Sequence, residues 1–398
     1  MVERVQGRIA FVPLRYGPQV VGGSEALTRE LAGGLAARGW EVEVLTSRVV
    51  DHIAWSDELP EGESHDHGVT IRRFSSIRRH SPAGQSAQLK IQQGIIPSLD
   101  EQWAWIAWRY TTPDLFRYLV RYGSLYDAVI FTPYLFWHTI VGLGVTPRNA
   151  VVMPCLHDEP YARLDIVRPV LSEPRSVWFL SEPEHALAHS RGPVTANHPV
   201  VGAGVAVPGS YDKPGFIRRF GIERPFVLYA GRREKDKGWD WLLETFAEAV
   251  DVGDLDVDLI TIGAGEVLTP SRLAGRIRDL GFLSEEDRND AFASALAYVQ
   301  PSRMESFSRT VMEAWLAGIP VLAREGSSVV EWHCERSGGG FSFADGSSLA
   351  HRIAAMCADS ALAAEMAAAG RRYVLDEYSW PVVLDRIEED LDLIKRHR

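Results

Sequence analysis

Residues 9–46 read IAFVPLRYGPQVVGGSEALTRELAGGLAARGWEVEVLT, and the changes of pattern within this stretch decide the fold. The apolar run at residues 9–14 predicts a buried strand, and residues 24–38 are expected to form a helix. Residues 41–46 return to the alternation of a second strand. A strand, a helix and a second strand in so short a span predict a βαβ unit.

The same rhythm continues along the rest of the chain. Further apolar runs predict strands at residues 128–132, 150–154 and 177–180, and then at residues 226–230, 259–262, 295–300 and 321–323. The segments between the runs are long enough to hold crossover helices, which is typical of parallel sheets. We therefore expect an α/β fold with two Rossmann-like, doubly wound parallel-sheet domains that face an interdomain cleft.

The boundary between the two domains is predicted within a connection that contains Pro and Gly, at residues 208–225. This places an N-terminal domain at residues 1–207 and a C-terminal domain at residues 208–378. Residues 379–398 carry apolar side chains at helical spacing, so they predict an amphipathic helix. We expect this helix to pack back towards the N-terminal domain.

Length, charge and cysteine usage limit the function classes. The chain has 398 residues, which is enough for two hydrophobic cores. Its net charge of −11 argues against nucleic acid as a partner, because phosphate binding depends on a basic excess. Three cysteines without CxxC spacing favour a reducing compartment, and residues 1–15 lack the layout of a signal peptide. These features predict a cytoplasmic location.

Residues 72–122 are less regular than the rest of the N-terminal half. Arginines near the start and tryptophans further on stand at Arg72, Arg73, Arg78, Arg79, Trp103, Trp105 and Trp108. We interpret the region as a solvated basic loop followed by a helix with a buried aromatic face. Contact with an acceptor, or peripheral contact with a membrane surface, is the alternative interpretation.

A cationic turn follows the strand predicted at residues 226–230. Only five lysines occur in the chain, and two of them lie in the turn at residues 231–238. Ligands of open parallel sheets bind beyond the carboxyl ends of strands, where this turn is expected. Arg232 and Lys237 therefore make a candidate clamp for a diphosphate. A charged surface turn without a ligand is an equally good interpretation of this segment alone.

Two glutamates, Glu305 and Glu313, stand eight residues apart around a predicted helix that Gly318 ends and that Ser306 or Ser308 caps. Eight helical residues span about 12 Å, whereas the carboxyl pair of a glycoside hydrolase needs about 5–9.5 Å. We therefore expect the two carboxylates to contact different parts of one extended ligand. Two solvated helix carboxylates are the simpler alternative.

Two further features lie at predicted strand ends. Gly22 and Gly23 at a helix start allow close approach of an anion, although the full dinucleotide fingerprint is absent. His157 follows the strand at residues 150–154 and is an equal candidate for a structural or a functional role. The acidic residues at positions 254, 256 and 258 precede a strand, so we interpret them as a polar loop and expect no metal site.

Taken together and in this order, these motifs resemble the retaining glycosyltransferases of the GT-B architecture, specifically glycosyltransferase family 4. The resemblance covers nearly the whole chain. Its motifs are the Gly-Gly-Ser-Glu loop at residues 22–25, His157, the Gly-Arg…Lys-Gly turn at residues 231–238, residues 280–284, and the Glu-x7-Glu frame of Glu305 and Glu313.

The resemblance implies roles for individual residues. Glu313 would bind the donor ribose, Glu305 would contact the transferred sugar, and His157 would act at the reaction centre, so His157 and Glu305 are the expected catalytic residues. The expected donor-binding residues are Gly22, Gly23, Arg232, Lys237, Leu283, Phe307, Ser308, Arg309, Thr310 and Glu313. Ser308 and Arg309 depart from the glycine and aliphatic residue that are usual in the family.

The activity that the resemblance implies is metal-independent transfer of a hexosyl unit, with retention of configuration, from a nucleoside diphosphate sugar to an acceptor hydroxyl. UDP- or GDP-sugars are the expected donors, and no further cofactor is required. The acceptor would be a polysaccharide, a glycolipid or a secondary metabolite in bacterial carbohydrate biosynthesis. A sugar-nucleotide epimerase and a non-catalytic sugar-nucleotide binding protein are the alternatives.

Overall fold

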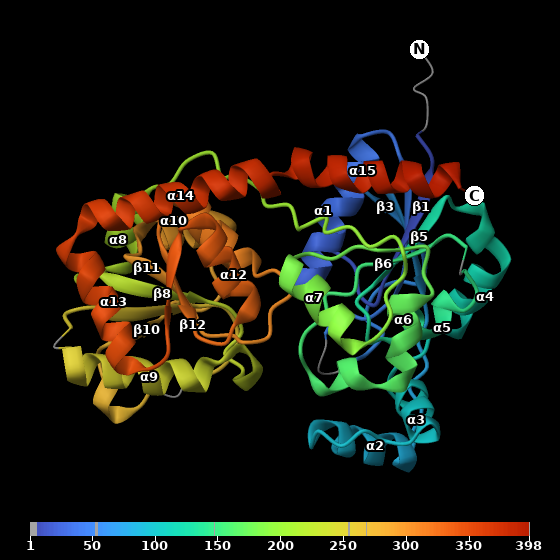
Figure 1. Cartoon of the computed structure of the whole chain (residues 1–398), viewed down its shortest axis with the longest axis horizontal. Coiled ribbons are helices and arrows are strands. Elements are labelled where there is room, and N and C mark those ends of the chain that lie inside the picture. Colours follow the sequence, from blue (N-terminus) through green and yellow to red (C-terminus); the bar gives the residue numbers. More distant parts are fainter. Residues whose placement is uncertain (1–5, 52–54, 147, 254, 268, 398) are drawn as a thin grey trace. The chain divides into compact units, whose positions relative to one another are not determined.

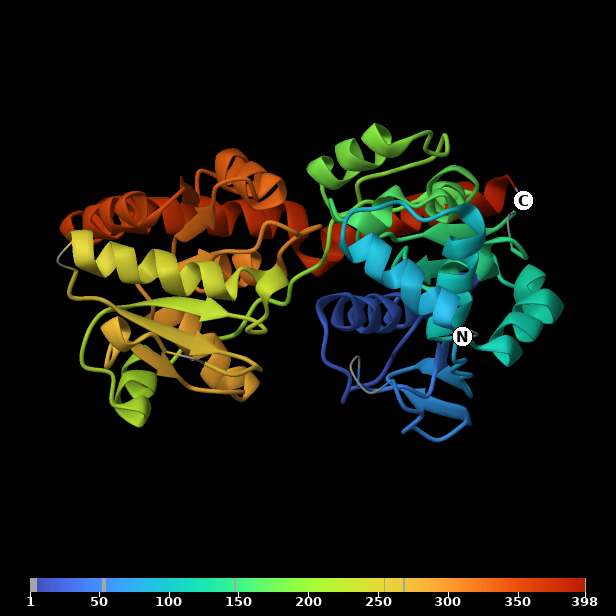
Figure 2. The same ribbon diagram turned by 90° about the horizontal axis from the view of Figure 1, so that it is seen from below.

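A computed structural model describes residues 6–51, 55–146, 148–253, 255–267 and 269–397 of the chain. The chain divides into two compact units (Figures 1 and 2). The first unit comprises Met1–Gly204 and Trp380–Arg398, and the second comprises Val205–Ser379. The division therefore follows Gly204, whereas the sequence predicts a boundary after residue 207.

The first unit contains a seven-stranded sheet with the strand order β3-β4-β2-β1-β5-β6-β7. Its strands are β1 (Arg8–Pro13), β2 (Glu41–Ser47), β3 (Gly62–Asp66), β4 (Val69–Phe74), β5 (Ala128–Thr132), β6 (Ala150–Val152) and β7 (Ser176–Val177). Its helices are α1 (Gly23–Ala37), α2 (Pro82–Gln92), α3 (Leu99–Arg109), α4 (Pro113–Tyr122), α5 (Trp137–Leu143), α6 (Arg168–Ser172), α7 (Glu182–Arg191) and α15 (Trp380–Arg396). The strands pair in parallel except for β3, which is antiparallel to β4. The predicted βαβ unit of β1, α1 and β2 is confirmed.

The closing helix α15 belongs to the first unit. Val383, Ile387 and Leu391 are fully or almost fully buried, as the helical spacing of apolar residues predicts. The buried carboxylate of Asp390 accepts hydrogen bonds from Trp178 Nε1 at 2.7 Å and from Asn197 Nδ2 at 2.6 Å. These bonds satisfy a charge that would be costly to bury alone, so they determine how α15 packs within this unit.

The basic region at residues 72–122 differs from the prediction. Arg72 and Arg73 lie in strand β4 and not in a loop. The guanidinium of Arg73 is buried and donates to Ser64 Oγ at 2.8 Å, while Arg72 pairs with Glu63 at 2.8 Å. The prediction of a solvated basic loop is therefore wrong for these two residues. The antiparallel pairing of β4 with β3, which the sequence analysis did not recognise, brings Ser64 and Glu63 to these two arginines.

The aromatic part of the same region is partly as expected. Trp105 on α3 is fully buried and donates from Nε1 to Gln88 Oε1 of α2 at 2.7 Å. Trp103 on the same helix is 45% exposed, together with Leu89, Ile95, Ile96 and Leu99. The α2–α3 hairpin therefore has a buried aromatic side and an exposed apolar side.

The second unit contains a six-stranded parallel sheet with the order β10-β9-β8-β11-β12-β13. Its strands are β8 (Phe226–Ala230), β9 (Asp258–Ile262), β10 (Ile277–Asp279), β11 (Ala297–Gln300), β12 (Val321–Arg324) and β13 (Gly340–Phe343). Its helices are α8 (Lys213–Phe220), α9 (Trp239–Gly253), α10 (Glu285–Ser294), α11 (Arg309–Leu316), α12 (Ser328–Ser337), α13 (Gly346–Ala358) and α14 (Ser360–Tyr378). Helices cover both faces, with α9 and α14 on opposite sides of the sheet (Figure 1). One apolar core joins the strands to α9 and α13.

No single helix in the described parts of the chain has the length and apolar composition needed to cross a membrane. Within the described residues, the bent pair α13 and α14, with 102° between its two helices, meets these requirements jointly, by length and composition alone.

Candidate functional site

In the second unit, strand order reverses between β8 and β11. From β8 the chain winds outwards through β9 and β10, and from β11 it winds the other way through β12 and β13. Adjacent parallel strands that lead in opposite directions leave a crevice at their carboxyl ends, and ligands of open α/β sheets bind there. The turn after β8, the loop after β11 and the helix α11 that follows this loop together carry most of the predicted donor-binding residues.

Lys237 and Glu305 meet at this switch point. Lys237 Nζ lies 2.9 Å from Glu305 Oε1, and the two side chains are 31% and 12% exposed. Lys237 ends a 3-10 turn at Lys235–Lys237 after β8, whereas Glu305 comes from the loop after β11. The structure therefore brings together two residues that the sequence separates by 68 positions. In this pair, a residue predicted to bind phosphate contacts a residue predicted to bind the sugar.

Gly238 explains how the lysine turn approaches the loop after β11. Its φ is +74°, and a Cβ added there would meet the backbone oxygen of Pro301 at 2.4 Å. Only glycine adopts this backbone conformation at little cost and tolerates so close a contact. The turn can therefore press against Pro301, which places Lys237 beside the loop that carries Glu305.

The two arginines of the turn have different environments. Arg233 is buried, and its guanidinium donates to the carbonyl oxygens of Gly263 and Gly265, both at 2.9 Å, and pairs with Asp279. Arg232 is 41% exposed and pairs with Glu234 at 3.0 Å. An exposed pair of this kind contributes little, so an anionic ligand can replace it. Arg233 therefore holds the loop that contains Gly263 and Gly265. Arg232 faces solvent, so it is accessible to a phosphate.

Glu313 has a different cationic partner from Glu305. Its carboxylate pairs with Arg288 on α10. Burial lowers the pKa of Arg288, but the charge of Glu313, its hydrogen bond to Arg288 and the nearby Tyr298 and Glu285 together raise it, so the net shift is upwards. Glu305 lies before α11, which begins only at Arg309. The separation of about 12 Å, which assumed that both glutamates lie on one helix, therefore does not apply to them. Their different cationic partners are nevertheless consistent with contacts to different parts of one ligand.

The start of α11 has no side-chain cap. Ser308 occupies the cap position with φ +67°, and its hydroxyl accepts from Gln300 Nε2 at 2.7 Å instead of from the helix. Ser308, one of the two predicted capping residues, therefore occupies the cap position without making the capping hydrogen bond from its side chain. Thr310 Oγ1 accepts from Tyr298 OH at 2.9 Å. Helix-start N–H groups attract anions, so the absence of a side-chain cap suits the predicted phosphate contact.

Leu283 lies on a loop and is partly exposed, whereas the side chain of Phe307 is buried. Leu283 lies in the half-buried loop between β10 and α10, beside Phe282, which is 73% exposed. Phe307 is buried, and its ring packs edge-on against His333 and Tyr378. The side chain of Phe307 is therefore part of the core, and only its backbone remains for a ligand. Arg309 is the first residue of α11.

The first unit has its own switch point between β1 and β5, and the loop after β1 leads to Gly22 and Gly23. A Cβ at Gly22 would meet the carboxylate of Glu25 at 2.1 Å, while nothing lies within 4 Å of one at Gly23. Glu25 in turn pairs with the buried Arg15. Gly22 is thus covered by a carboxylate, and Gly23 is the glycine that a ligand can approach.

His157 follows β6, next to β5 in the same sheet. Its Nδ1 lies 3.8 Å from Glu159 Oε1, and the ring is 31% exposed. The same Glu159 oxygen accepts from Tyr134 OH, after β5, at 2.8 Å. A partly exposed imidazole near a carboxylate that is itself held in place can take part in proton transfer or charge stabilisation.

The loop before His157 is held by the buried Glu184 of α7, which the sequence analysis missed. Its two carboxylate oxygens accept from Leu156 N at 2.5 Å and from Leu180 N at 2.6 Å. Complete burial raises the pKa of Glu184 to about 8, against the opposite effect of these backbone hydrogen bonds. Arg288 was also missed. Neither residue stands at a strand end, so only a tertiary contact reveals them.

The acidic residues expected to form a polar loop are engaged in ion pairs where the structure describes them. Asp258 is the first residue of β9 and accepts from Arg224 Nε at 2.9 Å, and Asp256 lies 3.4 Å from Arg276. Asp254 lies outside the described residues. The interpretation as a loop is wrong for Asp258.

Comparison with known families agrees with this geometry. The family described as "Glycosyl transferases group 1" matches residues 224–359, which include Arg232, Lys237, Glu305 and Glu313. A GDP-mannose-dependent monoacylated alpha-(1-6)-phosphatidylinositol monomannoside mannosyltransferase of Corynebacterium glutamicum is 24% identical over 190 residues, or 44% of this chain and 50% of the relative. The chain spans half or less of the length of the curated relatives it matches.

Solved structures match over almost the whole chain. Sucrose-phosphate synthase from Thermosynechococcus elongatus has a TM-score of 0.73 at 18% identity and covers 99% of this chain and 100% of its own. Anabaena HepE in complex with UDP-glucose has a TM-score of 0.70 at 17% identity, with coverages of 97% and 100%. The prediction of two Rossmann-like units of the GT-B architecture is confirmed.

Proposed function

We propose that the protein is a retaining glycosyltransferase that moves a hexosyl unit from a nucleoside diphosphate sugar to an acceptor hydroxyl. The observation that carries the proposal is the 2.9 Å contact between Lys237 and Glu305 at the switch point of the second sheet. It lies within the segment that matches the glycosyltransferase family, residues 224–359. A cation for the diphosphate and a carboxylate for sugar hydroxyls are what an extended donor requires at one end of a sheet.

In this proposal the second unit binds the donor. Arg232 and Lys237 hold the diphosphate, together with backbone N–H groups at the start of α11. Glu305 accepts hydrogen bonds from the sugar, and Glu313 binds the ribose. The pairs of Lys237 with Glu305 and of Arg288 with Glu313 orient both carboxylates before the donor arrives. Leu283 and the exposed Phe282 lie beside the nucleobase.

Transfer breaks the bond between the anomeric carbon and the diphosphate oxygen and forms a bond to the acceptor oxygen on the same face. The acceptor proton passes to the departing phosphate oxygen, so atoms and charge balance without a carboxylate nucleophile. Negative charge grows on the diphosphate as it leaves, and fixed cations stabilise that charge most in the transition state. This chemistry assigns no step to a metal ion.

The first unit supplies the reaction-centre histidine in this proposal. His157 contacts the sugar at the reaction centre and stabilises the positive charge that develops at the anomeric carbon, or the orientation of the sugar there. Gly23, open on the side where a Cβ would stand, lets a phosphate approach the start of α1. The acceptor binds on the first unit in this proposal.

We also propose peripheral membrane contact through the α2–α3 hairpin, which suits a glycolipid acceptor. Ile95 and Ile96 are 52% and 55% exposed, and Trp103 is 45% exposed. Aromatic and aliphatic side chains of this kind bind at the headgroup level of a bilayer. Flotation with anionic phosphatidylglycerol vesicles tests this. Loss of binding in an Ile95→Ser/Ile96→Ser variant, with binding kept in a Val252→Ser variant on α9, supports it.

A thermal-shift screen with UDP, GDP, ADP and dTDP tests the donor site. A bound nucleotide at 100 times its Kd adds about 2.7 kcal/mol of stability and raises the melting temperature of the protein. Product analysis with the matching nucleotide sugar then separates the candidate functions. An epimerase converts the donor alone, a transferase releases nucleoside diphosphate and glycosylates an acceptor, and a binding protein does neither. Absence of a shift with every nucleotide would refute the proposed donor site.

A further inference from the structure

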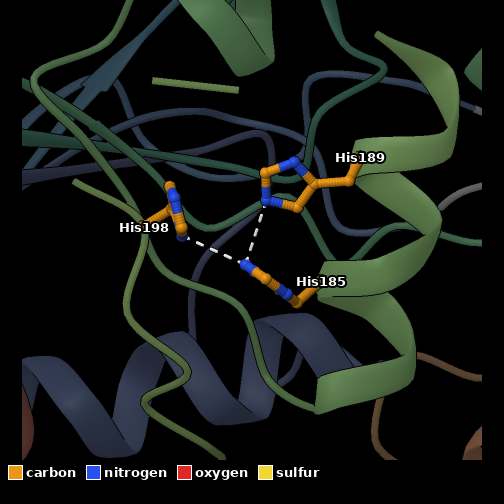
Figure 3. Close-up of side chains that lie close together, drawn as sticks. All are labelled: His185, His189 and His198. Atoms are coloured by element: carbon orange, nitrogen blue, oxygen red, sulfur yellow. Dashed lines mark hydrogen bonds between the residues drawn. The ribbon is translucent and has the colours of Figure 1, made fainter. Parts of the chain in front are cut away.

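Three histidines of the first unit converge on one point. His185 and His189 lie on α7, and His198 lies in the segment that follows this helix (Figure 3). His185 Nε2 is 3.0 Å from His198 Nδ1 and 3.1 Å from His189 Nε2. One nitrogen of each ring lies within 4.8 Å of the others. The cluster contains none of the residues proposed for sugar transfer.

Hydrogen bonding alone does not account for this arrangement. An imidazole nitrogen carries either one proton or one in-plane lone pair, so it makes one good hydrogen bond. His185 Nε2, however, has two ring nitrogens at about the same short distance. Burial lowers the pKa of His185, and the two neighbouring rings add to that effect. A cation that accepts the lone pairs of all three ring nitrogens accounts for their close approach.

The backbone explains why the three rings meet. His185 and His189 are four residues apart, so they lie on the same face of α7. Residues 197–199 run beside β7, where Val177 N donates to Asn197 O and Phe179 N donates to Pro199 O, both at 3.0 Å. Side chains alternate in an extended segment. Since Asn197 points to Asp390 of α15, His198 points the opposite way, towards α7.

We propose that His185, His189 and His198 form a binding site for a divalent first-row transition metal, and that Zn²⁺ is the ion it binds. Tetrahedral zinc with zinc–nitrogen bonds of about 2.0–2.1 Å places its ligand nitrogens about 3.3 Å apart. Two of the three nitrogen–nitrogen distances, 3.0 and 3.1 Å, are close to this value, and the nitrogens of His189 and His198 lie within 4.8 Å of each other. Imidazole is a preferred ligand for zinc, whereas Mg²⁺ requires oxygen ligands.

The surroundings of the cluster suit a metal site of this kind. Glu182 Oε2 lies 4.0 Å from Nδ1 of His185, on the side of the ring away from the cluster. A carboxylate behind a metal-binding histidine orients the ring and strengthens it as a ligand. The ring of Phe179 packs edge-on against His185 at 5.2 Å. His189 is exposed, so water can enter as the fourth ligand. A bound metal would tie residues 197–199 to α7.

Calorimetric titration of the untagged full-length protein with Zn²⁺ tests the site, with Mg²⁺ as the comparison ion. We expect one equivalent of Zn²⁺ to bind and to raise the melting temperature in a way that EDTA reverses. Mg²⁺ should do neither. His189→Ala and His198→Ala should each weaken Zn²⁺ binding at least tenfold, because each removes one of three ligands. His351→Ala, an exposed histidine on α13, should bind as the wild type does.

Circular dichroism in EDTA shows whether each variant retains its fold. A Co²⁺ titration of the wild-type protein adds a readout that needs no variant, since four-coordinate cobalt absorbs strongly in the visible range. Failure of the wild type to bind a stoichiometric equivalent of Zn²⁺ would overturn the proposal. Equal affinity in the wild type, His189→Ala and His198→Ala would overturn it as well. Neither result bears on nucleotide binding by the second unit, so the two proposals can fail separately.

Discussion

Replacing Lys237 by Met removes the charge at the switch point of the second sheet and keeps most of the apolar stem. The ammonium group lies 2.9 Å from Glu305, and both side chains are less than one-third exposed, so solvent screens their interaction only in part. A hydrogen bond between charged groups contributes about 1.5–3 kcal/mol. We expect Lys237→Met to lower the free energy of unfolding of the second unit by about 1–2 kcal/mol.

The same substitution should weaken nucleotide binding more than it weakens the fold. A charge-assisted contact between the ammonium and a diphosphate of about 1.5–3 kcal/mol corresponds to a rise in Kd of about 10- to 150-fold. Calorimetry with the nucleoside diphosphate that gives the largest thermal shift measures this change. Lys235→Met is the matched control, because Lys235 is exposed in the same turn. Its Kd should stay within about twofold of the wild-type value.

A double-mutant cycle separates the ion pair from the ligand contact. If Lys237 and Glu305 stabilise each other, the combined Lys237→Met/Glu305→Gln variant should lose about 1 kcal/mol less stability than the sum of the single variants. The Kd for nucleotide should still be raised in the combined variant, since the diphosphate contact is missing. A Lys237→Met variant that binds nucleotide within twofold of the wild type would refute the proposed phosphate contact.

Three further predictions concern stability. Gly238→Ala should cost about 2–4 kcal/mol, from backbone strain and the clash with Pro301, whereas Gly221→Ala, with φ +56° and no atom within 4 Å of its Cβ, should cost about 1 kcal/mol in urea unfolding. His138→Phe should stabilise the first unit by about 1 kcal/mol in calorimetry, since both ring nitrogens of this buried histidine lack a partner among the described residues. The pKa of Glu184, raised to about 8, predicts that the native state holds a proton that the unfolded state releases above about pH 4.5. The contribution of this proton to the free energy of unfolding is fully present below about pH 4.5 and is lost as the pH rises through 8. The loss is at most roughly 3–5 kcal/mol. Glu184→Gln should therefore flatten the fall in unfolding free energy between about pH 5 and 8.5.

The parts of the fold that depend on local pattern could be predicted from the sequence. The strands at β5 and β8 match their apolar runs residue for residue, because a strand buried on both faces reads as a continuous apolar segment. β3 escaped prediction because its sequence, Gly-Glu-Ser-His-Asp, is polar and exposed. It forms at the sheet edge through backbone pairing with β4. Such pairing cannot be predicted from the pattern of apolar and polar side chains.

The limits at the site have the same physical origin. Lys237 and Glu305 could be named because each follows an apolar strand, and parallel strands bring their carboxyl ends to one edge. Their pairing depends on Gly238, whose positive φ and close contact with Pro301 are properties of the folded backbone. The three histidines gather because Asn197 binds Asp390 of the closing helix and so directs His198 towards α7. A contact almost two hundred residues away in sequence thus determines the ligand geometry, so a spacing rule that looks for ligands on one helix finds His185 and His189 but not the third.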